Sequence, residues 1–212
     1  MGKHDSGPIE SHGPALSGAK CGLILLHGRG AGAADIMALG RRIAPELCGV
    51  LAPEASGNTW YPVSFLMPRE QNEPDLSDAL ARIASLFTTM ADAGIPREKI
   101  VLGGFSQGAC LSLEYVARNP GRYGGVFALS GGLIGPHIDA HDYNGLLERT
   151  PVFIGCSDID PYIPVERVRE SAAVMEHLGA EVDLRIYPGI AHTVVEDELE
   201  YMVGHLAGLV TD

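Results

Sequence analysis

Residues 99–117 read KIVLGGFSQGACLSLEYVA and contain the motif Gly-x-Ser-x-Gly at Gly104–Gly108. An apolar run precedes this motif and a helix-capable stretch follows it, which predicts a strand, a sharp turn and a helix. A turn of this kind exposes the Ser106 hydroxyl, and its glycines allow the strand and the helix to approach closely. The helix N-terminus would direct backbone N–H groups at an anion that forms on the serine. We interpret Ser106 as a candidate nucleophile, with a serine that only caps the helix as the alternative.

Short apolar runs and amphipathic stretches alternate along the rest of the chain. The expected strands cover residues 21–27, 49–52, 99–103, 125–129, 151–156 and 182–187. The expected helices cover residues 35–47, 75–93, 107–117, 164–178 and 194–209. Continuous apolar strands that alternate with helices are typical of a parallel sheet whose two faces are both covered. We therefore expect an α/β fold with a mostly parallel central sheet and helices on both faces.

The length and the segments of the chain favour one domain. A chain of 212 residues is ordinarily a single domain. Residues 1–20 are polar and interrupted by glycine and proline, so we expect a poorly ordered segment there and one domain over residues 21–212. No apolar stretch resembles a signal peptide or approaches the roughly 18–20 residues of a membrane span. The four cysteines are scattered without a Cys-x-x-Cys pair, which favours a cytoplasmic protein with reduced thiols.

The composition limits the classes of partner. Hydrophobic residues make up 46% of the chain and charged residues 20%, as in ordinary soluble domains. The formal net charge of −12 repels phosphate backbones and anionic lipid headgroups. We therefore expect no nucleic-acid partner and no electrostatic docking to membranes.

Acidic and histidine side chains follow two other expected strands. Asp158 and Asp160 come directly after residues 151–156, and His192 comes after the last expected strand. The carboxyl ends of parallel strands meet at one edge of a sheet, where ligand sites lie. A serine nucleophile needs a base and an acid, which hydrolases with this turn carry in the order Ser, Asp, His. His192 is the candidate base. Position alone leaves the acid open between the two aspartates, although Pro161 favours an extended Asp160.

Four segments carry a family resemblance. They are Leu26-His27-Gly28, GFSQG around Ser106, Asp160-Pro161-Tyr162-Ile163-Pro164 and Pro188-Gly189-Ile190-Ala191-His192. Together they resemble the phospholipase/carboxylesterase family of α/β hydrolases, which includes acyl-protein thioesterases and small bacterial carboxylesterases. The resemblance covers roughly residues 20–208.

The resemblance implies an α/β-hydrolase fold without a separate cap domain. It also implies a serine carboxylesterase that cleaves small carboxylic esters through an acyl-enzyme, with Ser106 as nucleophile, His192 as general base and Asp160 as the acid that orients the histidine. The backbone N–H groups of Arg29 and Gln107 would form the oxyanion hole. Such chemistry needs no metal and no cofactor, and its partner is a small-molecule ester. A homodimer is one option for the assembly.

One departure from the family's pattern bears on the substrate. Thioesterase members carry an aspartate soon after the His-Gly turn, whereas this chain has Gly30-Ala31-Gly32. The difference favours a small-ester hydrolase, with lysophospholipase and acyl thioesterase activities as alternatives. A hydrolase-fold protein that binds ligands without catalysis is a further hypothesis, which the presence of all three triad residues disfavours.

Aromatic and apolar side chains gather in the long loop over residues 54–74. Loops at the carboxyl edge of a parallel sheet supply substrate contacts, so this loop is the candidate wall of a substrate pocket. The residues concerned are Trp60, Tyr61, Phe65 and Met67. A loop that only packs on the body is the alternative. The Arg29 side chain is interpreted either as binding a substrate carboxylate or as exposed to solvent.

Two other motifs give competing hypotheses. Residues Gly28–Ala33 satisfy Gly-x-Gly-x-x-Ala after a strand, and Glu54 follows the next strand, as in a dinucleotide-binding oxidoreductase. Glu54 nevertheless lies farther along the chain than the spacing of about 20 residues typical of that fingerprint. A second group could ligate a metal, although a solvated loop is the better interpretation of it. This group consists of His137, Asp139, His141 and Asp142.

Overall fold

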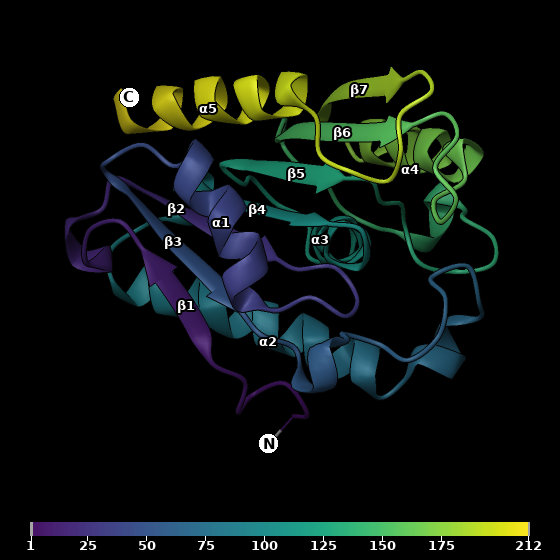
Figure 1. The fold of residues 1–212 in the computed structure, drawn as a ribbon, viewed down its shortest axis with the longest axis horizontal. Coiled ribbons are helices and arrows are strands. Elements are labelled where there is room, and N and C mark those ends of the chain that lie inside the picture. Colours follow the sequence, from purple (N-terminus) through teal and green to yellow (C-terminus); the bar gives the residue numbers. More distant parts are fainter. Residues whose placement is uncertain (1, 212) are drawn as a thin grey trace.

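Seven strands form one sheet, in the order β1-β3-β2-β4-β5-β6-β7, in the computed structural model, which describes residues 2–211. They are β1 (Ile9–His12), β2 (Cys21–Leu26), β3 (Cys48–Pro53), β4 (Ile100–Phe105), β5 (Gly125–Leu129), β6 (Pro151–Ser157) and β7 (Glu181–Tyr187). Neighbouring strands run parallel, except that β1 is antiparallel to β3 (Figure 1). The mostly parallel α/β sheet expected from the sequence is confirmed.

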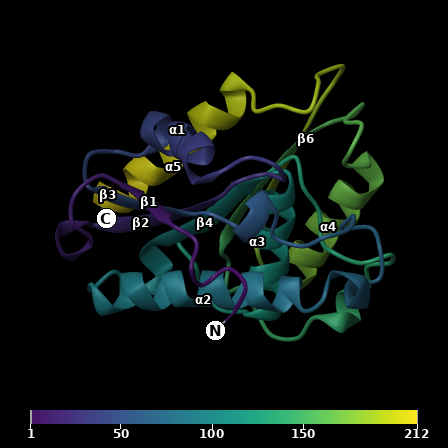
Figure 2. The same cartoon turned by 60° about the horizontal axis from the view of Figure 1, so that its bottom comes forward.

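Within residues 2–211, helices cover both faces of this sheet. They are α1 (Ala33–Ile43), α2 (Asp75–Asp92), α3 (Gln107–Arg118), α4 (Val165–His177) and α5 (Glu196–Thr211). Figure 2 shows α1 and α5 on one face and α2, α3 and α4 on the other. Successive strand residues alternate between these faces. In β2, Leu23 and Leu25 pack on the α1 and α5 side, whereas Ile24 and Leu26 pack on the opposite side. Because both faces are buried, the strand is a continuous apolar run.

The register of the strands brings their carboxyl ends together. Leu26 of β2 lies opposite Gly104 of β4, and Ser157 of β6 lies opposite Tyr187 of β7. The arrows of β5, β6 and β7 point the same way in Figure 1. The loops that follow β2, β4, β6 and β7 therefore leave the sheet at one edge, where ligands of parallel sheets bind.

The N-terminal segment differs from the expectation of poor order. Residues 9–12 form β1, which pairs along the edge of β3. His4 is fully buried, with its Nδ1 accepting the Ser56 N–H and its Nε2–H donating to the Trp60 carbonyl. Hydrophobic periodicity does not reveal this strand, because IESH has no apolar face and its residues are mostly exposed. Main-chain pairing and the buried histidine order the segment instead.

The first helix is also shorter than expected. It spans Ala33–Ile43, whereas the periodicity predicts residues 35–47. Pro45 accounts for the difference, because a residue before proline is disfavoured in the α region, and Ala44 has an extended backbone with φ −76 and ψ 126. The other expected boundaries lie within two residues of the observed ones.

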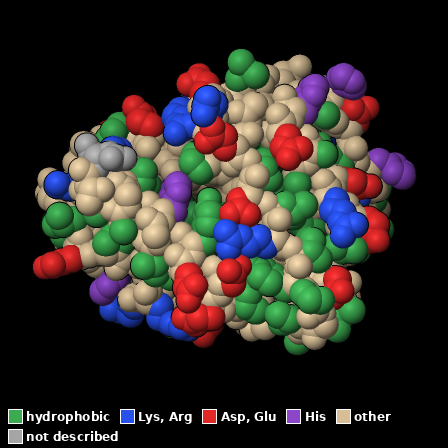
Figure 3. Space-filling model, turned by 90° about the horizontal axis from the view of Figure 1, so that it is seen from above, with side chains coloured by type: hydrophobic (Ala, Val, Ile, Leu, Met, Phe, Trp, Pro, Cys, Tyr) green, Lys and Arg blue, Asp and Glu red, His purple; other side chains and the backbone are tan. Residues whose placement is uncertain are grey.

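Three further observations concern thiols, membranes and charge. Cys21, Cys48, Cys110 and Cys156 are buried and have free thiols. Among residues 2–211, none of the helices combines the length and the apolar character needed to cross a membrane. Figure 3 views the molecule from the side of α5 and β7, where basic and acidic side chains lie next to one another.

Candidate active site

The turn after β4 is held by main-chain contacts. Ser106 adopts φ 56 and ψ −116 there, a conformation that non-glycine residues rarely adopt. A Cβ atom on Gly108 would lie 2.1 Å from the Leu26 carbonyl oxygen, and one on Gly104 would lie 2.5 Å from the Gly108 backbone. Glycine at both positions therefore allows α3 to approach β2 and β4 more closely than any side chain would permit. The turn leaves Ser106 partly exposed at the N-terminus of α3.

An acid and a base meet across the loops after β6 and β7. The Nδ1–H of His192 donates to Asp160 Oδ2 at 2.6 Å. The other carboxylate oxygen, Oδ1, accepts the N–H groups of Tyr162 at 2.9 Å and Ile163 at 3.1 Å. Burial works to raise the pKa of Asp160, but the hydrogen bonds from His192, Tyr162 and Ile163 outweigh it and hold that pKa below its ordinary value of 3.8. Asp160 is therefore a carboxylate at neutral pH, and Nε2 is the histidine nitrogen that remains for a reacting group.

Asp158 has a different set of partners. Its Oδ1 accepts the Gly189 N–H at 2.7 Å, and its own N–H donates to the Tyr187 carbonyl at 3.1 Å. These bonds tie the loop after β6 to the loop that carries His192. Of the two aspartates, Asp160 is the one bonded to the imidazole.

Ser106 and His192 line the same cavity, whose volume is about 720 Å³. The His192 ring packs between Phe105 and Tyr162, at centroid distances of 4.7 and 5.1 Å. Apolar side chains contribute much of the remaining wall, among them Tyr61, Val63, Phe65 and Ile163. A reacting group in this cavity would therefore lie in a largely apolar surrounding.

Two of the four residues expected in the substrate pocket line this cavity, and two do not. Tyr61 and Phe65 are in its wall. Trp60 is fully buried, because its indole N–H donates to the His27 carbonyl at 3.0 Å and its ring lies near the rings of His4 and His27. Met67 is 40% exposed and lies outside the cavity lining. Neighbouring residues of an irregular loop point in different directions, so composition alone could not separate these cases.

The two amides expected to bind an oxyanion both border the cavity. Arg29 lies in the turn after β2, and Gln107 is the first residue of α3, directly after Ser106. In the hydrogen-bond network of residues 2–211, neither backbone N–H donates to another residue. A free N–H is expected at the first position of a helix, since its amide has no intrahelical partner.

The Arg29 side chain is bound to the opposite loop. Its guanidinium donates to the Thr59 hydroxyl and to the carbonyls of Tyr61, Pro62 and Val63, each at 2.9 Å. Arg29 is exposed, as one of the two interpretations of its side chain expects, although the sequence does not indicate these contacts. The partners lie at least 30 residues along the chain, so no local pattern signals them.

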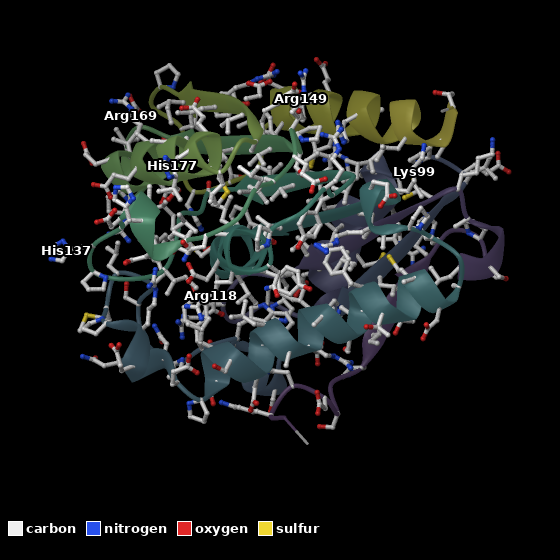
Figure 4. All side chains as sticks on the ribbon, turned by 180° about the vertical axis from the view of Figure 1, so that it is seen from behind. Lys99, Arg118, His137, Arg149, Arg169 and His177 are labelled. Carbon is white, nitrogen blue, oxygen red and sulfur yellow. The ribbon has the colours of Figure 1, made fainter. Side chains whose placement is uncertain are left out.

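The residues proposed for a dinucleotide site and for a metal site are not arranged as those two hypotheses require. The N-terminus of α1, where a pyrophosphate would bind, is taken by the chain's own acid, since Glu54 Oε2 accepts the Ala33 N–H at 3.2 Å. His137 projects away from the molecule at one end of the view in Figure 4. Within residues 2–211, no group of three or more His, Cys, Asp or Glu side chains could hold a metal ion.

Sequence comparison connects the chain to one group of proteins. The sequence profile of the Phospholipase/Carboxylesterase family matches residues 17–210. Acyl-protein thioesterase 1 of Saccharomyces cerevisiae is 37% identical over 166 residues, which cover 74% of this chain and 71% of the yeast protein.

Two solved structures are similar over nearly the whole chain. The crystal structure of a phospholipase/carboxylesterase from Dyadobacter fermentans has a TM-score of 0.92 and 42% sequence identity, and the match covers 98% of this chain and 99% of that one. The esterase PE8 has a TM-score of 0.75 and 27% identity, with 96% and 98% covered.

Proposed function

Because the chain belongs to the Phospholipase/Carboxylesterase family, we propose that it cleaves small carboxylic esters through an acyl-enzyme on Ser106. The family match and the similar esterase structures make the chain a hydrolase of the esterase and acyl-thioesterase group. The proposal adds the residues that carry the reaction: Ser106 as nucleophile, His192 as base and Asp160 as orienting acid, with the amides of Arg29 and Gln107 as oxyanion donors.

One observation supports this assignment above the others. Ser106 stands on a strained turn at the wall of the cavity that His192 also lines, and the far nitrogen of His192 is bonded to the buried Asp160 carboxylate at 2.6 Å. An imidazole fixed in this way keeps its Nδ1–H tautomer, which leaves Nε2 as a proton acceptor. Among the described residues that line this cavity, Arg29 is the one Lys, Arg, Asp or Glu side chain, and its guanidinium is bonded to the carbonyls of Tyr61, Pro62 and Val63. A neutral ester suits such a surrounding.

Acylation follows from these roles. His192 Nε2 takes the hydroxyl proton while Ser106 Oγ attacks the acyl carbon, and the carbonyl π pair moves onto oxygen. The N–H groups of Arg29 and Gln107 stabilise that oxyanion, and losing one such donor typically costs about 10²–10³ in rate. The intermediate then collapses, and the bond to the alcohol oxygen breaks. His192 returns the proton to the departing alcohol, and an ester remains on Ser106.

Deacylation repeats the sequence with water. His192 Nε2 takes a proton from water as the water oxygen attacks the acyl carbon, and the same two amides hold the second oxyanion. Ser106 leaves with the proton from His192, and the carboxylic acid departs. Asp160 stays ionised throughout and stabilises the imidazolium formed in each half-reaction.

A fluorophosphonate probe tests the nucleophile. We expect it to modify the wild-type protein once, at Ser106, and to abolish hydrolysis of p-nitrophenyl acetate. The variant Ser106→Ala should lose both reactions, because the hydroxyl is the nucleophile and its removal leaves no large cavity. Modification of another residue, or a folded Ser106→Ala protein that keeps more than a few per cent of the rate, would refute the assignment.

A thioesterase activity is the second candidate, favoured by the identity with a yeast acyl-protein thioesterase. The absence of an aspartate at Gly30-Ala31-Gly32 disfavours it. A panel of p-nitrophenyl esters of graded length, acyl-CoA and lysophospholipid separates the candidates. The proposal expects the highest kcat/KM on a short ester, and a higher value on the thioester or on the lysophospholipid would replace it.

A further inference from the structure

Residues 59–63, here called the wall loop, line the cavity through Tyr61, Pro62 and Val63. The Arg29 guanidinium holds this loop. Its Nη1 donates to the Thr59 hydroxyl and the Pro62 carbonyl, and its Nη2 donates to the carbonyls of Tyr61 and Val63, each at 2.9 Å. Because the guanidinium is a rigid planar fork, these four acceptors are fixed relative to one another and to the turn after β2.

The Gln107 side chain holds the same loop. Its Oε1 accepts the Trp60 N–H at 2.9 Å and the Thr59 hydroxyl at 3.3 Å, and its Nε2 donates to the Tyr61 carbonyl at 2.8 Å. The Gln107 side chain is buried. The Tyr61 carbonyl thus accepts hydrogen bonds from both Arg29 and Gln107, which joins the start of α3 to the turn after β2.

We propose that Arg29 and Gln107 are positioning residues whose side chains fasten both halves of the oxyanion hole to the wall loop. Together with the main-chain contacts at Gly108, the loop then fixes the separation of their two backbone N–H groups. This inference rests on the proposed function, which makes those amides the oxyanion donors. The turn after β2 and the start of α3 come from different parts of the chain, and the shared loop adds a second connection between them to the main-chain contacts at Gly108.

Main-chain contacts beside the loop support the same arrangement. The Gly30 N–H donates to the Asn58 carbonyl at 2.8 Å, and the Asn58 side-chain amide donates to the Ala31 carbonyl at 2.9 Å. The turn that carries the Arg29 amide is therefore bound to the residue directly before the wall loop. Catalytic groups must be held within about 0.5 Å of the productive geometry, so a mobile loop would weaken oxyanion binding.

The double role of the wall loop has a consequence for substrate choice. A substrate that presses on Tyr61, Pro62 or Val63 also moves the acceptors of Arg29 and Gln107. An ester too large for the cavity would then lower kcat by displacing the oxyanion donors, in addition to any effect on KM. We expect selection by size to appear in kcat.

Three single variants test the inference. In Arg29→Ala we expect kcat for a short ester to fall about tenfold with KM little changed, which is less than the roughly 10²–10³ for loss of a donor. Arg29→Lys should show the same loss, because one ammonium group cannot replace a planar fork with four partners. Gln107→Met, which keeps the side-chain volume, should also lose about tenfold, because the amide that bonds Trp60 and Tyr61 is gone.

The double variant Arg29→Ala with Gln107→Met is the most discriminating. If both side chains act through one loop, the second substitution adds little once the loop is free. We expect a combined loss of about 10- to 30-fold, compared with about 100-fold for independent effects. If Gln107→Met does not fold, Gln107→Glu replaces it, since it keeps the acceptor for the Trp60 N–H and removes the donor to Tyr61.

The measurement is kcat and KM for p-nitrophenyl acetate, butyrate and octanoate, normalised by fluorophosphonate titration of active sites. A trifluoromethyl ketone forms an oxyanion on the serine. Its inhibition constant should rise by the same factor as kcat falls. The matched controls are Arg169→Ala and Gln71→Ala, both exposed, with Arg169 on α4 pointing away from the molecule in Figure 4. These controls should keep the wild-type values.

Several results would overturn the inference. The first two are an unchanged kcat in the folded single variants and a wild-type kcat in Arg29→Lys. The third is a double variant whose loss in kcat equals the product of the two single losses. The fourth is a single variant whose kcat falls by the full 10²–10³, about what a direct oxyanion donor contributes. In each case a wild type labelled at Ser106 leaves the proposed function standing. A wild type that is neither labelled nor active on any ester overturns the proposed function and this inference together.

Discussion

The turn at Ser106 and the wall loop border the same cavity, yet they are held in different ways. At the turn, main-chain atoms meet directly, and a Cβ on Gly108 would lie 2.1 Å from a carbonyl oxygen. At the wall loop, side chains hold the backbone, with Arg29 and Gln107 bonded to its carbonyls and amides. The first region leaves no space for variation in its glycines. The second depends on two side chains whose partners are mostly main-chain atoms.

This difference explains which region a sequence reveals. A turn built from main-chain contacts restricts consecutive residues, so it leaves a short pattern such as GFSQG. A loop held by distant side chains leaves no pattern, because its bonds to Arg29 and Gln107 connect residues 30 and 47 positions apart. We expect substitutions in the first region to abolish function or folding, and substitutions around the second to have smaller effects.

The largest effect in this comparison is expected at Asp160, whose carboxylate is fixed by the amides of Tyr162 and Ile163. Asp160→Asn should lower kcat/KM by a few orders of magnitude near neutral pH, toward the roughly 10⁴ that loss of an orienting aspartate can cost. Asp158→Asn is the matched control and should lose less than about tenfold, since that carboxylate accepts the Gly189 N–H of the loop, whereas Asp160 bonds the imidazole. Both variants are assayed at equal folded concentration. The opposite ranking would assign the role to Asp158.

The next effect tests the main-chain contacts of the turn. Gly108→Ala places a Cβ against the Leu26 carbonyl, and overpacking of this kind typically costs about 1–3 kcal/mol of unfolding free energy. Esterase activity should fall as well, because the Ser106 turn must shift. Gly204→Ala in α5 is the control, since a Cβ there has no atom within 4 Å and alanine favours a helix by up to about 1 kcal/mol. Urea unfolding of the two variants measures the contrast, and equal stabilities would show that the turn has room to relax.

The smallest effect concerns pH and the side chains that support the loop before residue 59. Burial lowers the pKa of His4 and of His27 below the ordinary 6.5, and each ring accepts a backbone N–H, from Ser56 and Ala55 respectively. A folded pKa below the unfolded one means that the unfolded chain binds more protons as pH falls. This stabilising contribution is therefore present above pH 6.5 and is lost as pH falls through the lower folded pKa.

The variant His4→Gln isolates this contribution. Between pH 6.5 and 5 the unfolding free energy of the wild type should fall more steeply than that of His4→Gln, by up to about 1.4 kcal/mol per pH unit. The difference between the two proteins is the diagnostic quantity, because burial raises the pKa of Glu198 to about 7 and that group acts in the opposite direction in this range. Chemical unfolding at several pH values gives both curves. Parallel curves would show that His4 does not titrate with folding.

The sequence predicted most of the sheet and the loops that carry the candidate triad. Ser106, Asp160 and His192 each follow an apolar strand, and the parallel register brings these strand ends to one edge. Their catalytic roles remain predictions. β1 was missed because a short exposed edge strand has no apolar alternation, and its pairing is a property of the backbone of β3.

Other parts of the site could not be predicted, because they depend on contacts between residues far apart in the sequence. Trp60 was expected in the pocket, but the buried His4 and His27 hold it inside the protein. Arg29 is exposed, as one of its two interpretations expects, but nothing near residue 29 indicates that its guanidinium bonds the carbonyls of residues 61–63. In both cases the deciding partner lies tens of residues away in the sequence. Local propensity and periodicity contain no information about such partners.

At Ser106, the positive φ makes stability and catalytic activity require different residues. A non-glycine residue held in such a conformation costs about 1–3 kcal/mol, which is a substantial share of the net stability of a typical domain. Glycine at this position would relieve the strain and remove the hydroxyl. A laboratory selection that scores only thermal resistance would therefore drift toward Ser106→Gly and an inert protein. Any programme to stabilise this chain needs a catalytic readout at every round, and its gains have to come from residues away from the turn.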